Sequence, residues 1–559
     1  DDERVLSTAV EVRQGELDGV VGGETGVRKR GRGDRVGIVL PNGPEATTGF
    51  VAVAGVPPWT PADEPAADRQ LATPDSAEIR PTTPATPAMP VSACSAVTPN
   101  PGAALFAAAA EAQVTGRLAV CAGSCGPGNT HLVNGLYDAQ RSGAPVLAIA
   151  SHIPSSQIGQ GYFQETHPDR VFVDCSDYCE LVSTAEQAPR VVHAAIRHAV
   201  QNSAVSVVSL PGDVADLKVA ADAPRLAPVR RGVTVPTVTA VEELAEELNR
   251  AERVALFCGE GVRGAHEEVM QLADVLGAPV GHSLRGKDAI QFDNPFDVGM
   301  TGLLGYGAAA AGLHDADLLV MLGTDFPYDQ FLPGTRTVQV DTDAAVIGRR
   351  TDVDLPIQGD VRSTVAAVLP MLQRKTDRSF LERMLEKHAR LMDKAVGAYT
   401  HDVLDMRPIH PEYAADLLDQ HLAPDAVVTA DTGMCNVWSA RYVRPLGTRR
   451  LIASYLHGSM ANALPHAIGA QASQPGRQVV AMCGDGGLSM LLGDLLTPVM
   501  YGLPVKVVVF NNSTLGMVKL EMLVNGLPDF QTDVPDTNYA EIARAIGFHA
   551  ERVEDASRL

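Results

Sequence analysis

Short apolar runs alternate with longer amphipathic stretches along most of the chain. The alanine-rich stretch 103–113 predicts a helix, and residues 116–123 (GRLAVCAG) predict a buried strand. A second helix and a second strand are expected over 128–143 and 144–151. Strands that alternate with helices in this way indicate an α/β fold built on a parallel sheet.

The same alternation returns in two later regions of the chain. A connector punctuated by proline (223–240) precedes the second region, and a charged amphipathic stretch (375–399) predicts a linker helix before the third. We therefore expect an α/β protein with three doubly wound parallel-sheet domains. The strands expected in the second region are 253–262, 316–326 and 336–344, and those in the third are 426–431, 478–485 and 505–512.

The first hundred residues differ from the rest. Residues 57–101 are rich in proline, alanine and threonine, a composition that buries little apolar surface and does not support regular backbone hydrogen bonding. We expect this part to be a linker or a disordered segment. The expected boundaries are 1–100 for the atypical segment and 101–222, 228–372 and 398–559 for the three α/β domains.

Composition narrows the range of functions. The formal net charge of −22 and the pI near 5.1 argue against nucleic acid or an anionic membrane as the main partner. No run of about 18 apolar residues predicts a membrane span, and the first residues lack the pattern of a signal peptide. The eight cysteines do not have the spacing of a zinc site, so we expect buried, reduced thiols in a cytoplasmic protein.

The candidate chemistry lies at the end of the expected strand 478–485. Asp485 stands between glycines there, and Asn511 and Asn512 end the next strand, which a right-handed crossover would place beside the first. Carboxylate and amide oxygens suit Mg²⁺ shared with a diphosphate, and glycines let the backbone approach such a ligand closely. The alternative is a structural glycine turn in which Asp485 only caps the following helix.

This arrangement resembles the thiamine diphosphate signature, in which a GDG motif is followed by a pair of asparagines. From about residue 103 to 559 the chain resembles the pyruvate oxidase family, and within it the pyruvate:quinone dehydrogenases. The resemblance implies a pyrimidine-binding domain (101–222), a central FAD domain (228–372) and a diphosphate-binding domain (398–559). The stretches that carry it are LAVCAGSCGPGN, VLAIASHIPSSQIGQGYFQETHP, DNPFDVGMTGLLGYG, LGTDFPY, LHGSMANALPHAIGAQA and MCGDGGLSM.

The resemblance also implies a set of residues around thiamine diphosphate. Asp485, Asn512 and the carbonyl oxygen of Thr514 would bind Mg²⁺. The diphosphate would lie against the backbone that follows each of these strands. The residues implied for that contact are Gly486, Gly487, Asn512, Ser513, Thr514, Leu515, Gly516 and Met517.

The expected catalytic residues are Phe163, Gln164 and Met460. Met460 would be an apolar wedge that keeps the cofactor bent, with Gly458 and Ser459 against its aminopyrimidine ring. The bend would hold a base beside the reacting carbon, which removes the need for a bimolecular encounter. For Phe163 and Met460 the alternative is ordinary core packing.

The middle domain resembles the FAD domain of the family. A carboxylate that follows a parallel strand, as Asp341 does, can accept from ribose hydroxyls, and glycine-rich turns admit a pyrophosphate. Some relatives, such as acetolactate synthases, keep FAD without using its redox chemistry. The residues implied to contact FAD are Thr301, Gly302, Leu303, Leu304, Thr324, Asp325, Phe326, Pro327, Tyr328 and Asp341.

The implied activity is oxidative decarboxylation of pyruvate to acetate and CO₂, with the electrons passing through FAD to a quinone. The resemblance implies a homodimer or homotetramer in the cytoplasm, peripheral to the membrane in some relatives. Two alternatives remain open. One is another thiamine-diphosphate-dependent 2-oxo acid decarboxylase or carboligase, such as an acetolactate synthase, and the other is a non-catalytic protein that binds the cofactors.

The chain departs from the family pattern in its first and last parts. The family places a glutamate just before the alanine-rich helix, where this chain has Pro101 and Gly102, and Glu111 should face elsewhere. This difference predicts slow turnover of pyruvate. Residues 32–54 resemble a piece of an adenylate-forming acyl-CoA synthetase without its nucleotide loop, and we expect the lipid-binding tail of the quinone-reducing relatives to be missing.

Overall fold

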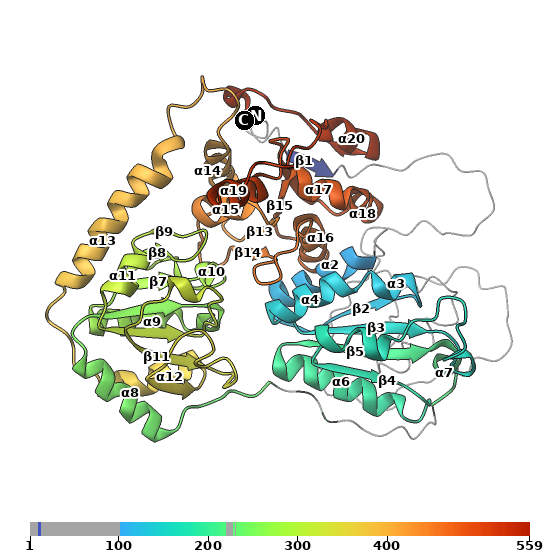
Figure 1. Ribbon diagram of the computed structural model, residues 1–559, viewed down its shortest axis with the longest axis horizontal. Helices are drawn as coiled ribbons and strands as arrows, with labels where there is room; N and C mark the ends of the chain where they lie inside the picture. The colour runs from blue at the N-terminus through green and yellow to red at the C-terminus, as the bar shows by residue number, and fades with distance from the viewer. Residues whose placement is uncertain (1–8, 13–100, 220–226, 228, 230) are drawn as a thin grey trace, which may run out of the picture. The chain divides into compact units, whose positions relative to one another are not determined.

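The computed structural model describes residues 9–12, 101–219, 227, 229 and 231–559 (Figure 1). The described chain forms two compact units. Residues 111–231 belong to the smaller unit, and residues 232–559 belong to the larger one together with strand β1 (Ala9–Val12) and the start of helix α2 (Pro101–Thr115). The rest of the atypical segment 1–100, including residues 32–54, lies outside the described residues.

The smaller unit is built on a four-stranded parallel sheet in the order β2-β3-β5-β4. The strands expected at 116–123 and 144–151 are β2 and β3, whereas a turn at His131–Leu132 divides the helix expected over 128–143. The bounds are β2 (Ala119–Gly123), α3 (Pro127–Thr130), α4 (Val133–Ser142), β3 (Val146–His152), α5 (Pro168–Val171), β4 (Tyr178–Leu181), α6 (Ala188–Asn202), β5 (Val205–Pro211) and α7 (Gly212–Ala215).

The central sheet of the larger unit has seven strands in the order β12-β11-β10-β6-β7-β8-β9, all parallel except the hairpin of β8 and β9. Successive residues of β6 point to opposite faces of the sheet. Leu256 packs with helices α8, α9 and α12, and Phe257 packs with α11, as a doubly wound sheet requires. The bounds are α8 (Val238–Arg250), β6 (Val254–Cys258), α9 (His266–Leu276), β7 (Val280–His282), α10 (Lys287–Ile290), β8 (Asp297–Met300), β9 (Tyr306–Gly307), α11 (Ala309–Asp315), β10 (Leu318–Leu322), β11 (Arg336–Asp341), β12 (Leu355–Gln358) and α12 (Val361–Val368).

The C-terminal sheet has the order β14-β13-β15-β16-β1-β17. Strands β13 to β16 are parallel neighbours, and β1 adds an antiparallel strand between β16 and β17 that the sequence analysis did not expect. The bounds are α14 (Pro411–His421), β13 (Val427–Ala430), α15 (Met434–Tyr442), β14 (Arg450–Ala453), α16 (Ala463–Ser473), β15 (Val479–Gly484), α17 (Asp485–Met490), α18 (Leu496–Tyr501), β16 (Lys506–Phe510), α19 (Gly516–Val524), α20 (Tyr539–Ile546) and β17 (Phe548–His549).

Two expected helices are shorter in the structure. The linker helix expected over 375–399 is α13 (Ser379–Leu391), which continues as a π-helical turn and a 3₁₀ turn up to Tyr399. The helix expected after Asp485 begins at that residue but breaks at Leu491, whose ψ of 35° is not helical. With these adjustments, the three expected parallel-sheet α/β domains are confirmed.

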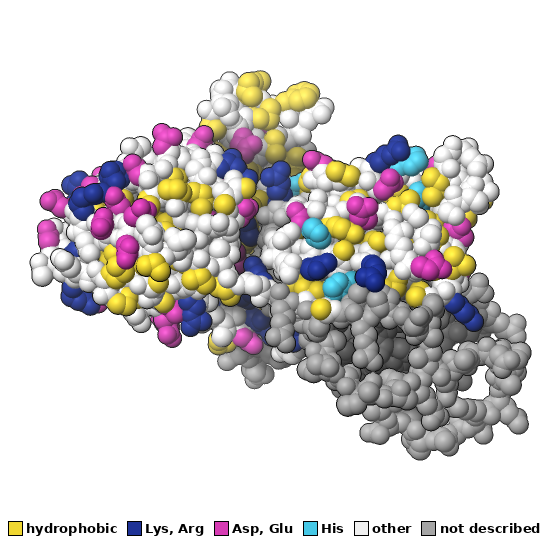
Figure 2. Space-filling model, turned by 90° about the horizontal axis from the view of Figure 1, so that it is seen from below, with side chains coloured by type: hydrophobic (Ala, Val, Ile, Leu, Met, Phe, Trp, Pro, Cys, Tyr) yellow, Lys and Arg dark blue, Asp and Glu magenta, His cyan; other side chains and the backbone are white. Residues whose placement is uncertain are grey.

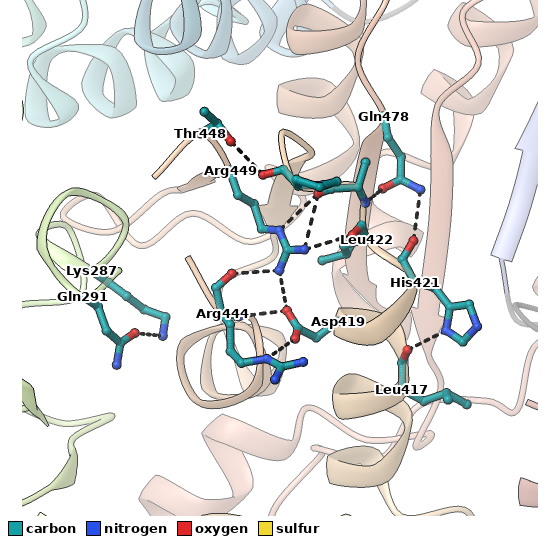
Figure 3. Close-up of polar contacts among 12 residues, drawn as sticks. Lys287, Gln291, Leu417, Asp419, His421, Leu422, Arg444, Thr448, Arg449 and Gln478 are labelled. Atoms are coloured by element: carbon teal, nitrogen blue, oxygen red, sulfur yellow. Dashed lines mark hydrogen bonds and ion pairs between the residues drawn. The ribbon is translucent and has the colours of Figure 1, made fainter. Parts of the chain in front are cut away.

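A buried ion pair fixes the start of β14 against α14 (Figure 3). The Arg449 side chain is 3% exposed and lies 2.5 Å from the Asp419 carboxylate, which also pairs with Arg444. Arg449 donates further to the carbonyl oxygens of Leu422 and Ala423. Because its donors meet acceptors, the buried charge is compensated, and the strand that leads toward Gly458 begins from a fixed point.

The surface shown in Figure 2 carries basic and acidic side chains interspersed over the described residues. On this face the acidic composition therefore does not produce a field of one sign. In the described part of the chain, no helix combines the length and the apolarity that crossing a membrane requires.

Candidate cofactor site

The site begins where two neighbouring strands of the C-terminal sheet end. Strands β15 and β16 pair in parallel, with Gly484 opposite Phe510. Asp485 follows β15, and Asn511 and Asn512 follow β16, so the three residues leave the sheet at the same edge. The adjacency expected from the crossover rule is confirmed.

Asp485 is almost fully buried at this edge. It is 3% exposed, and within the described residues its Oδ2 atom is buried without a hydrogen-bond partner. Burial raises the pKa of Asp485, whereas backbone N–H groups of Gly486, Ser513 and Thr514 act in the opposite direction. A buried carboxylate oxygen that lacks a donor is costly, and a bound cation would remove that cost.

The loop after β16 is held in one conformation by its own contacts. Ser513 has a φ of 53°, in the left-handed region, and the Oδ1 atom of Asn512 accepts from the Thr514 N–H at 3.2 Å. Asn511 donates to Asp536 at 3.1 Å, and the Leu515 N–H donates to the Thr532 carbonyl at 2.8 Å. The sharp turn therefore presents the Asn512 amide and the following backbone without further ordering.

Glycines 486 and 487 are required by packing as well as by any ligand. A Cβ atom at Gly487 would lie 2.2 Å from Asp431 Oδ2, and one at Gly486 would lie 2.6 Å from Leu515 Cδ2. The same Gly486 position lies 3.5 Å from Met460 Cε, so Met460 and Leu515 converge on this glycine. The structure thus brings Met460 to the GDGG turn, although it lies 25 positions before Asp485 in the sequence.

The turn before Met460 is a strained backbone segment. Gly458 has a φ of 71° and Ala461 a φ of 62°. Within this turn the Ser459 N–H donates to Ser454 Oγ at 2.9 Å, and Ser459 Oγ donates to the Met460 carbonyl at 2.9 Å. A non-glycine residue at positive φ is held there only by its surroundings, which is common at ligand sites.

Sequence reasoning missed Asp431, which lies at the floor of the site. It follows β13, is 2% exposed, and accepts from the N–H groups of Ala463 at 2.9 Å and Gly484 at 3.3 Å. Burial raises its pKa to about 6. The available signal was its position, because it ends an expected strand and is followed closely by Gly433 at a φ of 130°.

The donor set at this edge fits Mg²⁺. Asp485 supplies a carboxylate oxygen, Asn512 an amide oxygen and Thr514 a carbonyl oxygen, which are the hard ligands that Mg²⁺ prefers when it is shared with phosphates. Thr514 O accepts one bond, from the Gly516 N–H at 2.9 Å, and a carbonyl oxygen has a second lone pair. Such an ion would give a partner to the Oδ2 atom of Asp485, which is buried and has none in the part of the chain that the structure describes.

The two stretches expected to contact FAD come together in the central domain. A Cβ atom at Gly302 would lie 3.0 Å from Phe326 Cζ, which places the 301–304 stretch against the 324–328 stretch. Thr301 is 3% exposed, and its Oγ1 atom is buried without a hydrogen-bond partner within the described ranges. A buried hydroxyl without a partner can bond a polar ligand group, so these residues are compatible with a nucleotide.

Asp341 lies at the same sheet edge as the 324–328 stretch, because β10 and β11 are parallel neighbours. Its Oδ1 atom accepts from the Asp343 N–H at 3.1 Å, and burial raises its pKa. Asp325 is paired with Arg349 and Arg350. Asp341 is therefore placed to accept from a ligand hydroxyl, whereas the Asp325 carboxylate is already engaged by two cations.

Phe163 and Gln164 belong to the smaller unit. Phe163 is 77% exposed, which excludes core packing within this unit, and Gln164 has a φ of 59°. The Cys125 thiol donates to Gln164 Oε1 at 3.3 Å, and the Glu165 carboxylate accepts from the N–H groups of Gly161 and Tyr162. Phe163 is therefore a surface residue of this unit, on a loop in which Gln164 takes a left-handed conformation.

One cluster in the smaller unit has the residue types of a metal site. A ring nitrogen of His152, one of His167 and a carboxylate oxygen of Asp169 lie within 4.8 Å of one another. However, His152 Nδ1 accepts from the Ile153 N–H at 2.9 Å, so the neutral ring carries its proton on Nε2. A protonated nitrogen cannot ligate a cation, and we assign no metal to this cluster.

Cysteines behave as expected from the sequence. Within the described ranges all are free, and all except the half-buried Cys179 are buried. Burial raises the pKa of the Cys483 thiol well above its usual range, so this residue of the GDGG stretch is a poor nucleophile.

Comparison with known domain families finds a match in each of the three α/β domains. Residues 91–171 match the N-terminal TPP binding domain of thiamine pyrophosphate enzymes, residues 241–368 match their central domain, and residues 431–559 match their C-terminal TPP binding domain. The Asp485–Asn512 edge falls in the last of these, and the stretches around Thr301 and Asp341 fall in the central one.

Comparison with individual proteins extends the match over most of the chain. The thiamine pyrophosphate-containing protein YdaP of Bacillus subtilis is 35% identical over 458 residues, which cover 82% of this chain and 79% of that protein. Pyruvate oxidase of Lactiplantibacillus plantarum is 31% identical over 464 residues, 81% of this chain and 76% of that protein. Acetolactate synthase of Mycobacterium bovis is 33% identical over 470 residues, 80% and 76% respectively. The chain belongs to the thiamine pyrophosphate enzyme family.

Proposed function

We propose that this protein oxidatively decarboxylates pyruvate to acetate and CO₂, using thiamine diphosphate, Mg²⁺ and FAD, and passes the electrons to a quinone. The observation that carries the proposal is a carboxylate oxygen of Asp485 beside the Asn512 loop, which is buried without a hydrogen-bond partner among the described residues. Similarity to a pyruvate oxidase over all three domains supports pyruvate as the substrate. The convergence of Gly302 with Phe326 supports a nucleotide in the central domain.

In this proposal the C-terminal domain anchors the diphosphate. Asp485, Asn512 and Thr514 hold Mg²⁺, and the metal and the backbone N–H groups neutralise the phosphate charge. The backbone can approach closely because neither Gly486 nor Gly487 carries a side chain. The remaining residues proposed to line the diphosphate are Ser513, Leu515, Gly516 and Met517.

Met460 is proposed to set the shape of the bound cofactor. Its side chain meets Leu515 at Gly486, so it forms an apolar wedge beside the diphosphate loop. Gly458 and Ser459 would lie against the aminopyrimidine, and Phe163 and Gln164 would border the substrate. When bound, thiamine diphosphate supplies the electron sink for loss of CO₂, and FAD accepts the two electrons.

The central domain is proposed to bind FAD through its two converging stretches and Asp341. The Thr301 hydroxyl, buried without a partner in the described part of the chain, is available to a polar group of the ligand. Asp341 would accept from a ribose hydroxyl. The other proposed contacts are Gly302, Leu303, Leu304, Thr324, Asp325, Phe326, Pro327 and Tyr328.

The proposal extends to the assembly and location of the protein. We propose a cytoplasmic homodimer or homotetramer that donates to a quinone at the membrane. Leu520, Leu523 and Val524 of α19 are each about half exposed or more, and this helix has no buried residue in the isolated chain. An apolar helix beside the proposed diphosphate loop supports burial by another subunit.

Anaerobic mixing of the loaded protein with pyruvate tests the proposal. The expected result is slow loss of the visible flavin absorbance together with slow release of acetate, because the first turn of α2 has no acidic residue. Formation of acetolactate without bleaching would instead establish the carboligase alternative, which the acetolactate synthase relative supports. Neither product nor bleaching would indicate a non-catalytic cofactor-binding protein, an outcome that the absence of an acidic residue from the first turn of α2 favours.

A further inference from the structure

A short hairpin carries one of the two stretches proposed to contact FAD. Strands β8 and β9 pair Gly299 with Gly307 and Met300 with Tyr306, and the loop between them is residues 301–305. The Gly305 N–H donates to the Gly302 carbonyl at 2.9 Å, and the Thr301 N–H donates to the His282 carbonyl at 3.4 Å. The conformation of this loop therefore depends on how its two strands are held.

His388 of helix α13 lies against both glycines of the hairpin. A Cβ atom at Gly307 would lie 2.3 Å from His388 Nδ1, and one at Gly299 would lie 3.2 Å from His388 Cε1. Both glycines have positive φ angles, 76° and 89°. Figure 1 shows α13 running beside β8 and β9. The hairpin thus leaves a slot into which the imidazole fits. No side chain could take the place of the α-hydrogen of Gly299 or Gly307 that borders this slot.

The slot ends at a carboxylate that is 14% exposed. Asp297 Oδ2 lies 4.0 Å from His388 Nε2, and Asp297 Oδ1 lies 3.8 Å from His282 Nε2. Asp297 also accepts from the Gly299 N–H at 3.0 Å and from Gln291 Nε2 at 3.1 Å. Asp297, the first residue of the hairpin, therefore has two imidazoles beside it and accepts two hydrogen bonds.

The other strand of the hairpin is held through Tyr306. Lys287 Nζ donates to Gln291 Oε1 at 2.5 Å (Figure 3) and to the Tyr306 hydroxyl at 3.1 Å. Gln291 also donates to Tyr306 at 3.0 Å, and so connects Tyr306 with Asp297. Both ends of the 301–305 loop are consequently fixed to one polar network, and His388 is the side chain that the linker helix places beside it.

We propose that His388 is a positioning residue: by filling the slot between Gly299 and Gly307 and facing Asp297, it holds the 301–305 loop in the conformation that receives the flavin. This inference rests on the proposed flavin site. Met384, one turn earlier on α13, packs with Val298 and Ala308, so the helix that delivers His388 is anchored in the core of the same domain. The linker helix therefore acts as part of the flavin domain and not only as a connector.

The experiment compares His388→Ala and His388→Gln with the wild-type full chain, and uses Glu386→Ala, an exposed site on the same helix, as the matched control. Amide hydrogen exchange of residues 299–307 is measured without cofactors, and FAD affinity and the visible flavin spectrum are then measured by titration. In His388→Ala we expect exchange of the loop to rise about tenfold and FAD affinity to fall about tenfold. The His388→Gln variant keeps an amide within reach of Asp297, so it should restore most of the protection of the loop from exchange and most of the FAD affinity.

Wild-type exchange, affinity and spectrum in His388→Ala would overturn the inference. Exchange that rises equally across α13 and the whole sheet, with no recovery in His388→Gln, would also overturn it, because His388 would then only support folding. If the wild-type chain binds no FAD, the proposed function fails, while the exchange measured without cofactors still decides whether His388 positions the loop.

Discussion

Replacing Asp485 by asparagine separates the role of its charge from the role of its shape. The carboxylate is 3% exposed, one of its oxygens has no donor in the described structure, and burial raises its pKa. Without cofactors the negative charge is therefore a cost to the folded state. We expect Asp485→Asn to be at least as stable as the wild type in the absence of cofactors.

When the cofactors are bound, the effect of the Asp485 charge on stability changes sign, because the carboxylate becomes the anionic ligand of Mg²⁺. A hydrogen bond or contact to a charged group is worth about 1.5–3 kcal/mol, so we expect affinity for thiamine diphosphate with Mg²⁺ to fall about 100-fold. At a ligand concentration 100 times the wild-type dissociation constant, ligand binding stabilises the wild type by about 2.7 kcal/mol. The same concentration would stabilise the variant by only about 0.4 kcal/mol.

Isothermal titration calorimetry and denaturant unfolding with and without cofactors measure both effects. Glu554→Gln is the matched control, because it removes one acidic charge of the same domain from a side chain that is 73% exposed. Unchanged affinity in Asp485→Asn, or wild-type affinity in excess chelator, would refute the assignment of Asp485 to the metal. A loss of stability without cofactors would refute the reasoning about its buried charge.

Three further outcomes are expected. Gly487→Ala should lower the free energy of unfolding by about 1–3 kcal/mol, because its Cβ would lie 2.2 Å from Asp431 Oδ2; unchanged denaturant stability would show that Asp431 gives way. Burial lowers the pKa of Lys287 to about 8 from its ordinary 10.5, so the folded state disfavours the charged form. The contribution of Lys287 to stability should therefore rise by about 3 kcal/mol between pH 8 and pH 10.5, measured as the change across this range in the difference in unfolding free energy between the wild type and Lys287→Met. Deuterium exchange at the reactive carbon of bound thiamine diphosphate should be slow and should accelerate in Pro101→Glu, since positioned acid–base groups contribute about 10² to 10⁴ in rate; fast exchange in the unaltered chain would show that another carboxylate serves.

The local pattern of apolar and turn residues was enough to predict the α/β architecture and the strand ends that carry Asp485 and Asn512. Runs such as 478–485 and 505–512 are short, apolar and bounded by turn residues, and the structure has β15 and β16 inside those ranges. Their adjacency followed from the handedness of the connection, so it was predictable that Asp485 and Asn512 leave the sheet at the same edge. These inferences succeeded because periodicity and crossover geometry depend on neighbours in the sequence and on backbone chirality.

Contacts between distant segments were decided only by the tertiary structure. Asp431 and Gly487 follow different strands. Nothing in either local stretch indicates that the Asp431 carboxylate occupies the space that a side chain at Gly487 would need. Likewise, His388 lies on a helix that the sequence predicts only as an amphipathic linker, yet its ring lies against Gly299 and Gly307. The break at Leu491 and the strand β1 are of the same kind.

The physical reason is that the sequence encodes which faces are apolar, whereas packing chooses their partners. In the sequence alone, a glycine indicates only that the backbone has more conformational freedom at that position. Its requirement at Gly487 or Gly307 comes from an atom that another element brings to within about 2–3 Å. Burial has the same origin, so the raised pKa of Asp485 and the lowered pKa of Lys287 become visible only when three or four separate elements close around them.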